Sequence, residues 1–188
     1  MQQVNRLEYE DLEDKTCLEH YLCKHRLLYV PTEKDTHFGK QKINQHEAER
    51  VVDLVAAFQD LYARHKKPFD TKTLGIITPY RAQIAQIRKV LNERDIDPDQ
   101  FTIDTVERYQ GGARDIILIS LCTNSTGQLS SMISLSEEGV DRKLNVALTR
   151  ARQHLVILGN QEILGSDPIY RDLIGAFPVV DLPSLLKP

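Results

Sequence analysis

Three nearly continuous apolar runs, separated by stretches with helical periodicity, constrain the fold of this chain most strongly. They are Leu74–Thr78, Ile116–Leu121 and Leu155–Gly159, and shorter segments at Arg26–Val30 and Phe101–Asp104 add two candidate strands. Strands without polar alternation are expected where both faces of a sheet are covered, and strands that alternate with helices form parallel sheets with right-handed crossovers. The pattern therefore predicts an α/β fold with a mainly parallel sheet.

The segments between these runs supply the helices and the domain boundaries. A long helix is predicted over 46–66, and the spacing Asn44-x-x-Glu47 before it is typical of a helix cap. The charged residues 7–25 are also predicted to be helical. We therefore divide the chain into an N-terminal extension or connector at 1–26 and one domain at 27–188. Inside that domain, the Ser- and Gly-rich residues 123–139 are predicted to form a mobile loop. The predicted buried face of the long helix consists of Ala48, Val51, Val52, Val55 and Tyr62.

Composition limits the class of protein. The 188 residues are 41% hydrophobic and 27% charged, which is typical of one globular domain. The net charge of −3 argues against a freestanding nucleic-acid binder but allows one wall of a binding channel. No apolar run is long enough to span a membrane, and no signal peptide opens the sequence, so no membrane association is expected. Three cysteines without a CxxC pair favour an intracellular, cytoplasmic location, with the nucleus left open.

A possible metal site near the N-terminus is rejected on geometric grounds. Cys17, His20, Cys23 and His25 would fan over more than half of a helix circumference, so they cannot converge on one tetrahedral ion. The sequence therefore predicts no metal site in this chain.

The segment 142–152 places cations beside an apolar stripe. As one helix, it would carry Lys143 and Arg150 on one flank of that stripe. A guanidinium held rigidly beside the core suits phosphate, because its fork matches the phosphate oxygens in geometry and charge. An ordinary amphipathic helix with charged flanks is the alternative. The predicted stripe consists of Leu144, Ala147, Leu148 and Ala151.

Two more motifs favour the phosphate-binding alternative. They are ITPYRAQ at 77–83 and TVERYQGGARD at 105–115, and they join the segment RKLNVALTRAR at 142–152 as a set of three. In this order and spacing the three resemble the C-terminal motifs of superfamily 1 helicases. The nearest group is superfamily 1B, which includes the RNA helicase of nonsense-mediated decay. Its patterns are approximately ITPY-x-x-Q, TVD-x-[FY]QG-x-E-x-D and RR-[LI]-NVA-[LV]-TRAR, and the resemblance covers about residues 40 to 165.

The resemblance implies a fold and a chemistry. The fold is a RecA-like, P-loop-NTPase-type three-layer sandwich, here the second RecA-like domain of a helicase. Arg150 matches the first arginine of TRAR, which in the family reaches across a cleft to the γ-phosphate of ATP on a partner domain and stabilises the transition state. Gln110 and Gly111 are implied to couple the nucleic-acid track to the nucleotide. Arg142 either touches phosphate or anchors its helix, and Arg152 is expected to form a salt bridge.

The nucleic-acid track is expected at the carboxyl ends of the strands, where ligands bind in open α/β sheets. Thr78, Pro79, Tyr80 and Thr105 all follow predicted strands. Threonine hydroxyls and backbone N–H groups bind phosphate without reading sequence, and a tyrosine ring can stack on a base. The alternative for Tyr80 is a half-buried aromatic that seals the start of the next helix.

Some residues depart from the family pattern. Ala113 stands where the family has glutamate, and Glu107 stands where it has aspartate. The sequence contains no G-x-x-x-x-GK-[ST] motif and no strand end with an Asp-Glu pair that could hold magnesium. We therefore expect ATP and Mg²⁺ to be held mainly by an upstream RecA-like domain of the same parent chain. The isolated 188 residues are expected to be inactive.

Two functions follow from these motifs. The first is the C-terminal motor half of an ATP-dependent helicase, an ATP hydrolase that moves along single-stranded DNA or RNA. The second is a catalytically retired helicase module that serves as a nucleic-acid or protein-binding scaffold, which Ala113 favours. Both nucleic acids, both unwinding polarities and the oligomeric state are left open by these residues.

Overall fold

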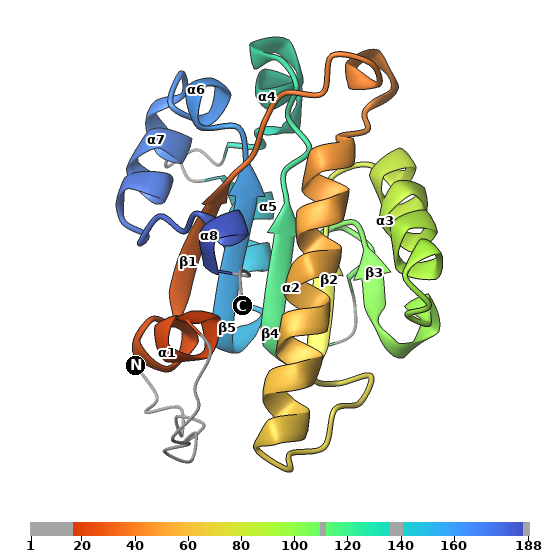
Figure 1. Cartoon of the computed structure of the whole chain (residues 1–188). Helices are drawn as coiled ribbons and strands as arrows, with labels where there is room; N and C mark the ends of the chain where they lie inside the picture. The colour runs from red at the N-terminus through yellow and green to blue at the C-terminus, as the bar shows by residue number, and fades with distance from the viewer. Residues whose placement is uncertain (1–16, 110–111, 136–140, 186–188) are drawn as a thin grey trace.

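A single parallel sheet of five strands forms the centre of the molecule, in the order β1-β5-β4-β2-β3 (Figure 1). A computed structural model describes residues 17–109, 112–135 and 141–185. All neighbouring strands are parallel, so their carboxyl ends lie at one edge of the sheet. The predicted α/β fold with a mainly parallel sheet is confirmed. The strands are β1 (Leu27–Pro31), β2 (Leu74–Ile77), β3 (Thr102–Asp104), β4 (Arg114–Ser120) and β5 (Ala151–Gly159).

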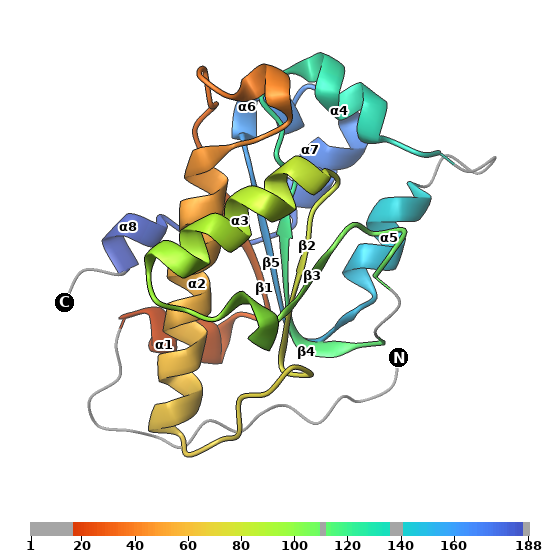
Figure 2. The same ribbon diagram turned by 90° about the vertical axis from the view of Figure 1, so that its right-hand side faces the viewer.

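Helices cover both faces of the sheet, which gives three layers (Figure 2). One face is covered by α1 (Cys17–Lys24), α2 (Gln45–Arg64), α3 (Arg81–Glu93) and α8 (Leu182–Leu185). The other is covered by α4 (Thr126–Met132), α5 (Arg142–Leu148), α6 (Gln161–Leu164) and α7 (Pro168–Gly175). Two short 3₁₀ helices, η1 (Gly39–Gln41) and η2 (Pro98–Gln100), lie in connections. The architecture is therefore a RecA-like three-layer sandwich.

Successive strand residues point to opposite layers. Ile116 and Leu118 belong to the core under α2, whereas Ile117 and Ile119 belong to the core under α5. Both sets are essentially inaccessible to solvent, which explains why this strand is apolar at consecutive positions. Within the described residues, no helix is both long enough and apolar enough to cross a membrane.

The long helix agrees with its prediction. It runs from Gln45 to Arg64, and the side chain of Asn44 caps it by accepting a hydrogen bond from the N–H of Glu47 at 2.9 Å. All five residues predicted for its buried face are buried. Of the predicted helix at 7–25, the described part is α1, and its Leu18 and Leu22 are buried in the core.

The prediction of a loop over 123–139 is wrong for part of that segment. Helix α4 begins after Ser125, whose side chain accepts a hydrogen bond from the N–H of Gln128. The helix buries Leu129 and Met132 against the α5 face of the sheet. A serine cap and two well-spaced apolar side chains are thus enough to form a short helix in a segment of low hydrophobicity.

The prediction of one helix over 142–152 is wrong at its C-terminal end. Helix α5 ends at Leu148, and Ala151 is already the first residue of β5. The carbonyl oxygen of Arg150 accepts a hydrogen bond from the N–H of Arg114 at 2.9 Å, and Ala151 pairs with Arg114 in the sheet. Because the sheet takes these backbone groups, the helix cannot continue. Arg150 therefore lies in the turn between α5 and β5.

Candidate functional site

A pocket of about 90 Å³ opens at the carboxyl ends of β2 and β4. Its floor is apolar and is formed by Ile77, Ile119 and Leu121. Its polar lining comes from the segments that follow β2 and β3 and from α4, α5 and α7. These polar or ring-bearing residues are Thr78, Pro79, Tyr80, Glu107, Ser131, Lys143 and Tyr170. The pocket thus collects three of the four residues that were predicted to contact nucleic acid.

Tyr80 occupies the N-cap position of α3 and is half-buried. Its hydroxyl donates a hydrogen bond to the carbonyl oxygen of Gln128 at 3.4 Å. The ammonium group of Lys42 lies 4.9 Å from the centroid of its ring, within the range of a cation–π interaction. Pro79 lies just before the N-cap residue, because the helix begins at Arg81.

Thr78 and Thr105 lie below this surface. Thr78 is fully buried and Thr105 is 7% exposed. The N–H of Thr78 is bonded to the carbonyl oxygen of Asp104, and the N–H of Thr105 is bonded to the carboxylate of Asp104. Their predicted phosphate contacts stay predictions. The more accessible residue at this edge of the sheet is Tyr80.

An ion pair stands at the mouth of the pocket. Lys143 of α5 lies 2.8 Å from the carboxylate of Glu107. The hydrogen bond from Lys143 holds the pKa of Glu107 below its usual value. Glu107, which replaces the family's aspartate, is therefore charged and forms an ion pair with Lys143 in the first turn of α5.

Asp141 fixes the start of α5 and connects it to α7. Its carboxylate accepts hydrogen bonds from the N–H groups of Lys143 and Leu144, at 3.0 and 3.2 Å, and from the hydroxyl of Tyr170 at 3.2 Å. Burial and the neighbouring carboxylate raise the pKa of Tyr170, so it remains a donor. Asp141 thus positions α5 against the pocket.

Arg150 lies at the other end of α5, beside the amino ends of β4 and β5. It is partly exposed, and its Nε is buried without a hydrogen-bond partner among the described residues. Its carbonyl oxygen accepts a hydrogen bond from the N–H of Arg114, whose guanidinium carbon is 5.9 Å from the Tyr109 ring centroid. Burial raises the pKa of Tyr109, and the charges of Arg114 and Arg150 partly offset this.

Tyr109 fits under these arginines because β2 has a glycine at the point of contact. A Cβ atom on Gly75 would lie 1.7 Å from the Tyr109 hydroxyl oxygen. Glycine at this position lets the hydroxyl end of the ring approach the strand backbone closely. Gln110 and Gly111, which follow Tyr109, lie outside the described residues. Their predicted role in coupling the nucleic-acid track to the nucleotide stays a prediction.

The structure does not bring Arg142 and Arg150 together. Arg142 is the exposed first residue of α5, and Arg150 follows its last turn. At 1.5 Å per residue, the helix separates them by roughly 10 Å. Arg142 lies at the pocket end of α5, beside Lys143, which lines the pocket. Its predicted contact with phosphate stays a prediction.

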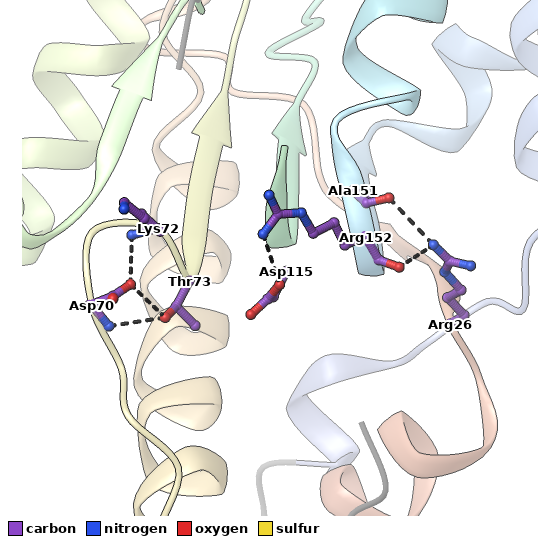
Figure 3. A network of polar contacts seen from close by, with 7 residues as sticks. All are labelled: Arg26, Asp70, Lys72, Thr73, Asp115, Ala151 and Arg152. Atoms are coloured by element: carbon purple, nitrogen blue, oxygen red, sulfur yellow. Dashed lines mark hydrogen bonds and ion pairs between the residues drawn. The ribbon is translucent and has the colours of Figure 1, made fainter. Parts of the chain in front are cut away.

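Arg152 is part of a structural network at the amino ends of the strands (Figure 3). Its guanidinium lies 3.7 Å from the carboxylate of Asp115, so the predicted salt bridge is confirmed. The carbonyl oxygens of Ala151 and Arg152 both accept hydrogen bonds from Arg26. In the same region, Asp70 accepts hydrogen bonds from the N–H of Lys72 and the hydroxyl of Thr73. Arg152 is thus neutralised, unlike Arg150.

Sequence reasoning missed a buried polar network at the carboxyl edge. Glu47 is not only a capping residue: its carboxylate accepts hydrogen bonds from the hydroxyl of Ser120 at 2.7 Å and from the N–H of Cys122 at 2.8 Å. Gln83, the last residue of ITPYRAQ, bonds to both backbone groups of Asn44 and to Ser120. The pattern Asn44-x-x-Glu47 was the available signal. The network ties α2, α3 and β4 together directly behind the pocket.

Within the described residues, no group of three or more His, Cys, Asp or Glu side chains is arranged to hold a metal ion.

Comparisons with known proteins agree with this geometry. The family model described as "AAA domain" matches residues 3–162. The ATP-dependent helicase MJ0104 of Methanocaldococcus jannaschii, whose name marks it as uncharacterized, is 33% identical over 70% of this chain and 17% of its own length. Helicase sen1 of Schizosaccharomyces pombe is 33% identical over 80% of this chain and 9% of its own length. The DNA polymerase alpha-associated DNA helicase A of Saccharomyces cerevisiae is 36% identical over 49% of this chain and 13% of its own length.

The chain therefore spans between 9% and 17% of the length of these relatives. The family model covers most of the chain, and the motifs lie in the matched part of a parallel α/β sandwich. The chain belongs to the AAA domain family and is the C-terminal domain of a superfamily 1 helicase related to the nonsense-mediated-decay helicase group.

Proposed function

We propose that this chain is the C-terminal motor half of an ATP-dependent helicase. In this proposal Arg150 is an arginine finger for ATP bound on an upstream RecA-like domain, and the carboxyl edge is part of the track for single-stranded DNA or RNA. The observation that carries the proposal is the environment of Arg150. It is held by a turn between α5 and β5, its Nε is buried, and no described carboxylate pairs with it. A partly buried cation without a counter-ion is costly, so the site suits an anion from outside the domain.

A phosphate group is the anion that fits best. The guanidinium is planar and always charged, and its fork matches phosphate oxygens. ATP would supply the phosphoryl group that is transferred to water, and the charge on its γ-phosphoryl oxygens is what a fixed arginine stabilises. The proposal leaves the nucleotide and Mg²⁺ mainly to the upstream domain, because this sequence has no Walker A motif. The printed name of the relative MJ0104, an ATP-dependent helicase, supports nucleotide use.

The proposed track lies at the opposite end of the strands. Tyr80 offers a half-buried ring for stacking, and Lys42 and Lys143 lie beside the pocket that it borders. In the proposal, Thr78 and Thr105 shape this edge from below, and Pro79 fixes the direction in which the chain enters α3. Closure of the two domains around ATP would move the strand along this edge, and hydrolysis would release it.

Arg150→Ala in the full-length protein tests the proposal. We expect ATP hydrolysis stimulated by single-stranded DNA or RNA to fall by about 10³- to 10⁵-fold, because the transition-state charge loses its counter-ion. Arg152→Ala is the matched control, since this arginine is two residues away and already paired with Asp115. We expect it to retain hydrolysis within a few-fold of the wild type. Equal losses in the two variants would contradict the assignment of Arg150 as the finger.

A retired helicase module that serves as a binding scaffold is the second candidate, and Ala113 is the observation that favours it. The family has glutamate at this position, and Ala113 directly precedes β4. If the full-length protein binds nucleic acid but does not hydrolyse ATP, and Ala113→Glu restores hydrolysis, the scaffold is the correct function.

A further inference from the structure

We propose that residues 36–42, here called the β1–α2 loop, form a second contact surface for single-stranded nucleic acid. In this proposal Phe38 stacks on a base, and Lys40 and Lys42 bind phosphates. The loop would extend the track beyond Tyr80. The inference rests on the proposed function, since it lengthens the same binding edge.

The loop is held rigidly from below. The buried carboxylate of Asp35 accepts hydrogen bonds from the N–H groups of His37 and Phe38, both at 2.8 Å, and of Gln45 at 2.9 Å. Asn124 accepts a hydrogen bond from the N–H of Asp35 and donates one to the carbonyl oxygen of Ile43. The backbone is thus fixed at both ends of the loop, so its side chains are presented in a set arrangement.

Phe38 is presented to solvent on this rigid support. It is 43% exposed, whereas the aromatic side chains of the core are almost fully buried. An exposed ring gains little in water, but it stacks on any base, because every base has a π face. A rigid loop reduces the ordering cost of such a contact.

Two exposed lysines follow Phe38 in the loop. Lys40 and Lys42 are exposed, and neither forms an ion pair within the part of the chain that the structure describes. Phosphates of a single strand are the natural partners of lysines spaced along a loop, since the contact releases counter-ions.

Lys42 joins the loop to the proposed track. Its backbone adopts a left-handed conformation with φ of 59°, which is uncommon for a residue with a side chain. Its carbonyl oxygen accepts a hydrogen bond from the Cys122 thiol, and its ammonium group lies 4.9 Å from the Tyr80 ring centroid. The loop and Tyr80 therefore form one continuous surface at the carboxyl edge, where Figure 1 places the segment between β1 and α2 at the same end as α4.

The test is fluorescence anisotropy of labelled oligodeoxythymidylate and oligouridylate with the full-length protein, at several salt concentrations. Lys40→Gln and Lys42→Gln should each reduce the slope of log affinity against log salt by about 0.7, as expected for one lost phosphate contact to a single strand. Phe38→Ala should weaken binding roughly 5- to 150-fold, the range of one stacked base, and should leave the salt slope unchanged.

Lys66→Gln is the matched control for Lys42→Gln. Lys66 is an exposed lysine that also has a left-handed backbone, with φ of 52°, but it lies after the other end of α2. We expect it to bind with the wild-type affinity and slope. The inference would be overturned if Lys40→Gln and Lys42→Gln showed the same salt slope as Lys66→Gln and Phe38→Ala bound with the wild-type affinity.

The same titrations separate this inference from the proposed function. If Tyr80→Ala weakens binding while all three loop variants bind as the wild type does, the track stands and the loop is not part of it. If the full-length wild-type protein binds neither oligonucleotide, the proposed track and its extension are both wrong.

Discussion

Glu47 holds the start of α2 to the end of β4 with a fully buried carboxylate. Burial raises its pKa from 4.5 to about 7, and the hydrogen bonds from Ser120 and Cys122 limit the rise. Because the pKa is higher in the folded than in the unfolded chain, this group stabilises the fold fully below about pH 4.5. That contribution is lost as the pH rises through 7.

Glu47→Gln should therefore remove a pH-dependent part of the stability. A shift of this size corresponds to about 3 kcal/mol. We expect the free energy of unfolding of the variant, relative to the wild type, to rise by about this amount between pH 4.5 and pH 8. Urea titrations at the two pH values measure it. Glu49→Gln, on the same helix, is the control, and a relative stability of Glu47→Gln that does not change with pH would contradict the prediction.

At the scale of elements, α5 connects the two ends of the candidate site. It begins beside the pocket, where Asp141 caps it, and it ends two residues before Arg150. Its position depends on that cap, because the same carboxylate also accepts the hydrogen bond of Tyr170 in α7.

Asp141→Ala should destabilise the fold by about 2–3 kcal/mol. The variant loses the cap, which is worth about 1 kcal/mol, and leaves the buried hydroxyl of Tyr170 without an acceptor. Asp141→Asn keeps an oxygen for the cap and should lose about half as much. Urea unfolding measures both, with Asp167→Ala, which removes only the cap of α7, as a control near 1 kcal/mol. Equal stabilities for the three variants would contradict this account.

The elements also explain which predictions from sequence succeeded. The central strands were predictable because they are buried on both faces, and the cap of α2 was predictable because Asn44 acts on its own helix. The end of α5 was not predictable, because it depends on the pairing of Ala151 with Arg114, a residue of β4 that is far from it in the sequence. The role of Glu47 was missed for the same reason, because its partner Ser120 follows it by 73 residues. Local signals were sufficient where the contacts are local.

At the scale of the whole molecule, the two halves of the candidate site lie at opposite ends of the strands. Tyr80 and the pocket are at the carboxyl edge, and Arg150 is beside the amino ends of β4 and β5. Sequence reasoning proposed both groups but did not predict their separation, because it placed Arg150 on a longer helix. A single ligand of ordinary size cannot fill both places, which suits a domain that binds two different partners.

The 188-residue chain alone should therefore show no ATP hydrolysis. Arg150 supplies charge stabilisation, but this sequence lacks a phosphate-cradling loop. Release of inorganic phosphate by the purified chain, with and without oligouridylate, is the measurement. Turnover by the chain that disappears in Arg150→Ala would refute this prediction, whereas turnover that persists in that variant would indicate a contaminating enzyme.

The strand order has a consequence for synthesis of the chain on the ribosome. β1 pairs only with β5 within the sheet, and an isolated bridge joins its Tyr29 to Val179 on the other side. The first strand of this domain to leave the ribosome is thus among the last to find its neighbours. Until β5 emerges, the apolar side chains of Leu28 and Val30 have no sheet to join. The nascent domain therefore carries an open strand through most of its own translation, and this is the interval in which it is most exposed to aggregation and to capture by chaperones.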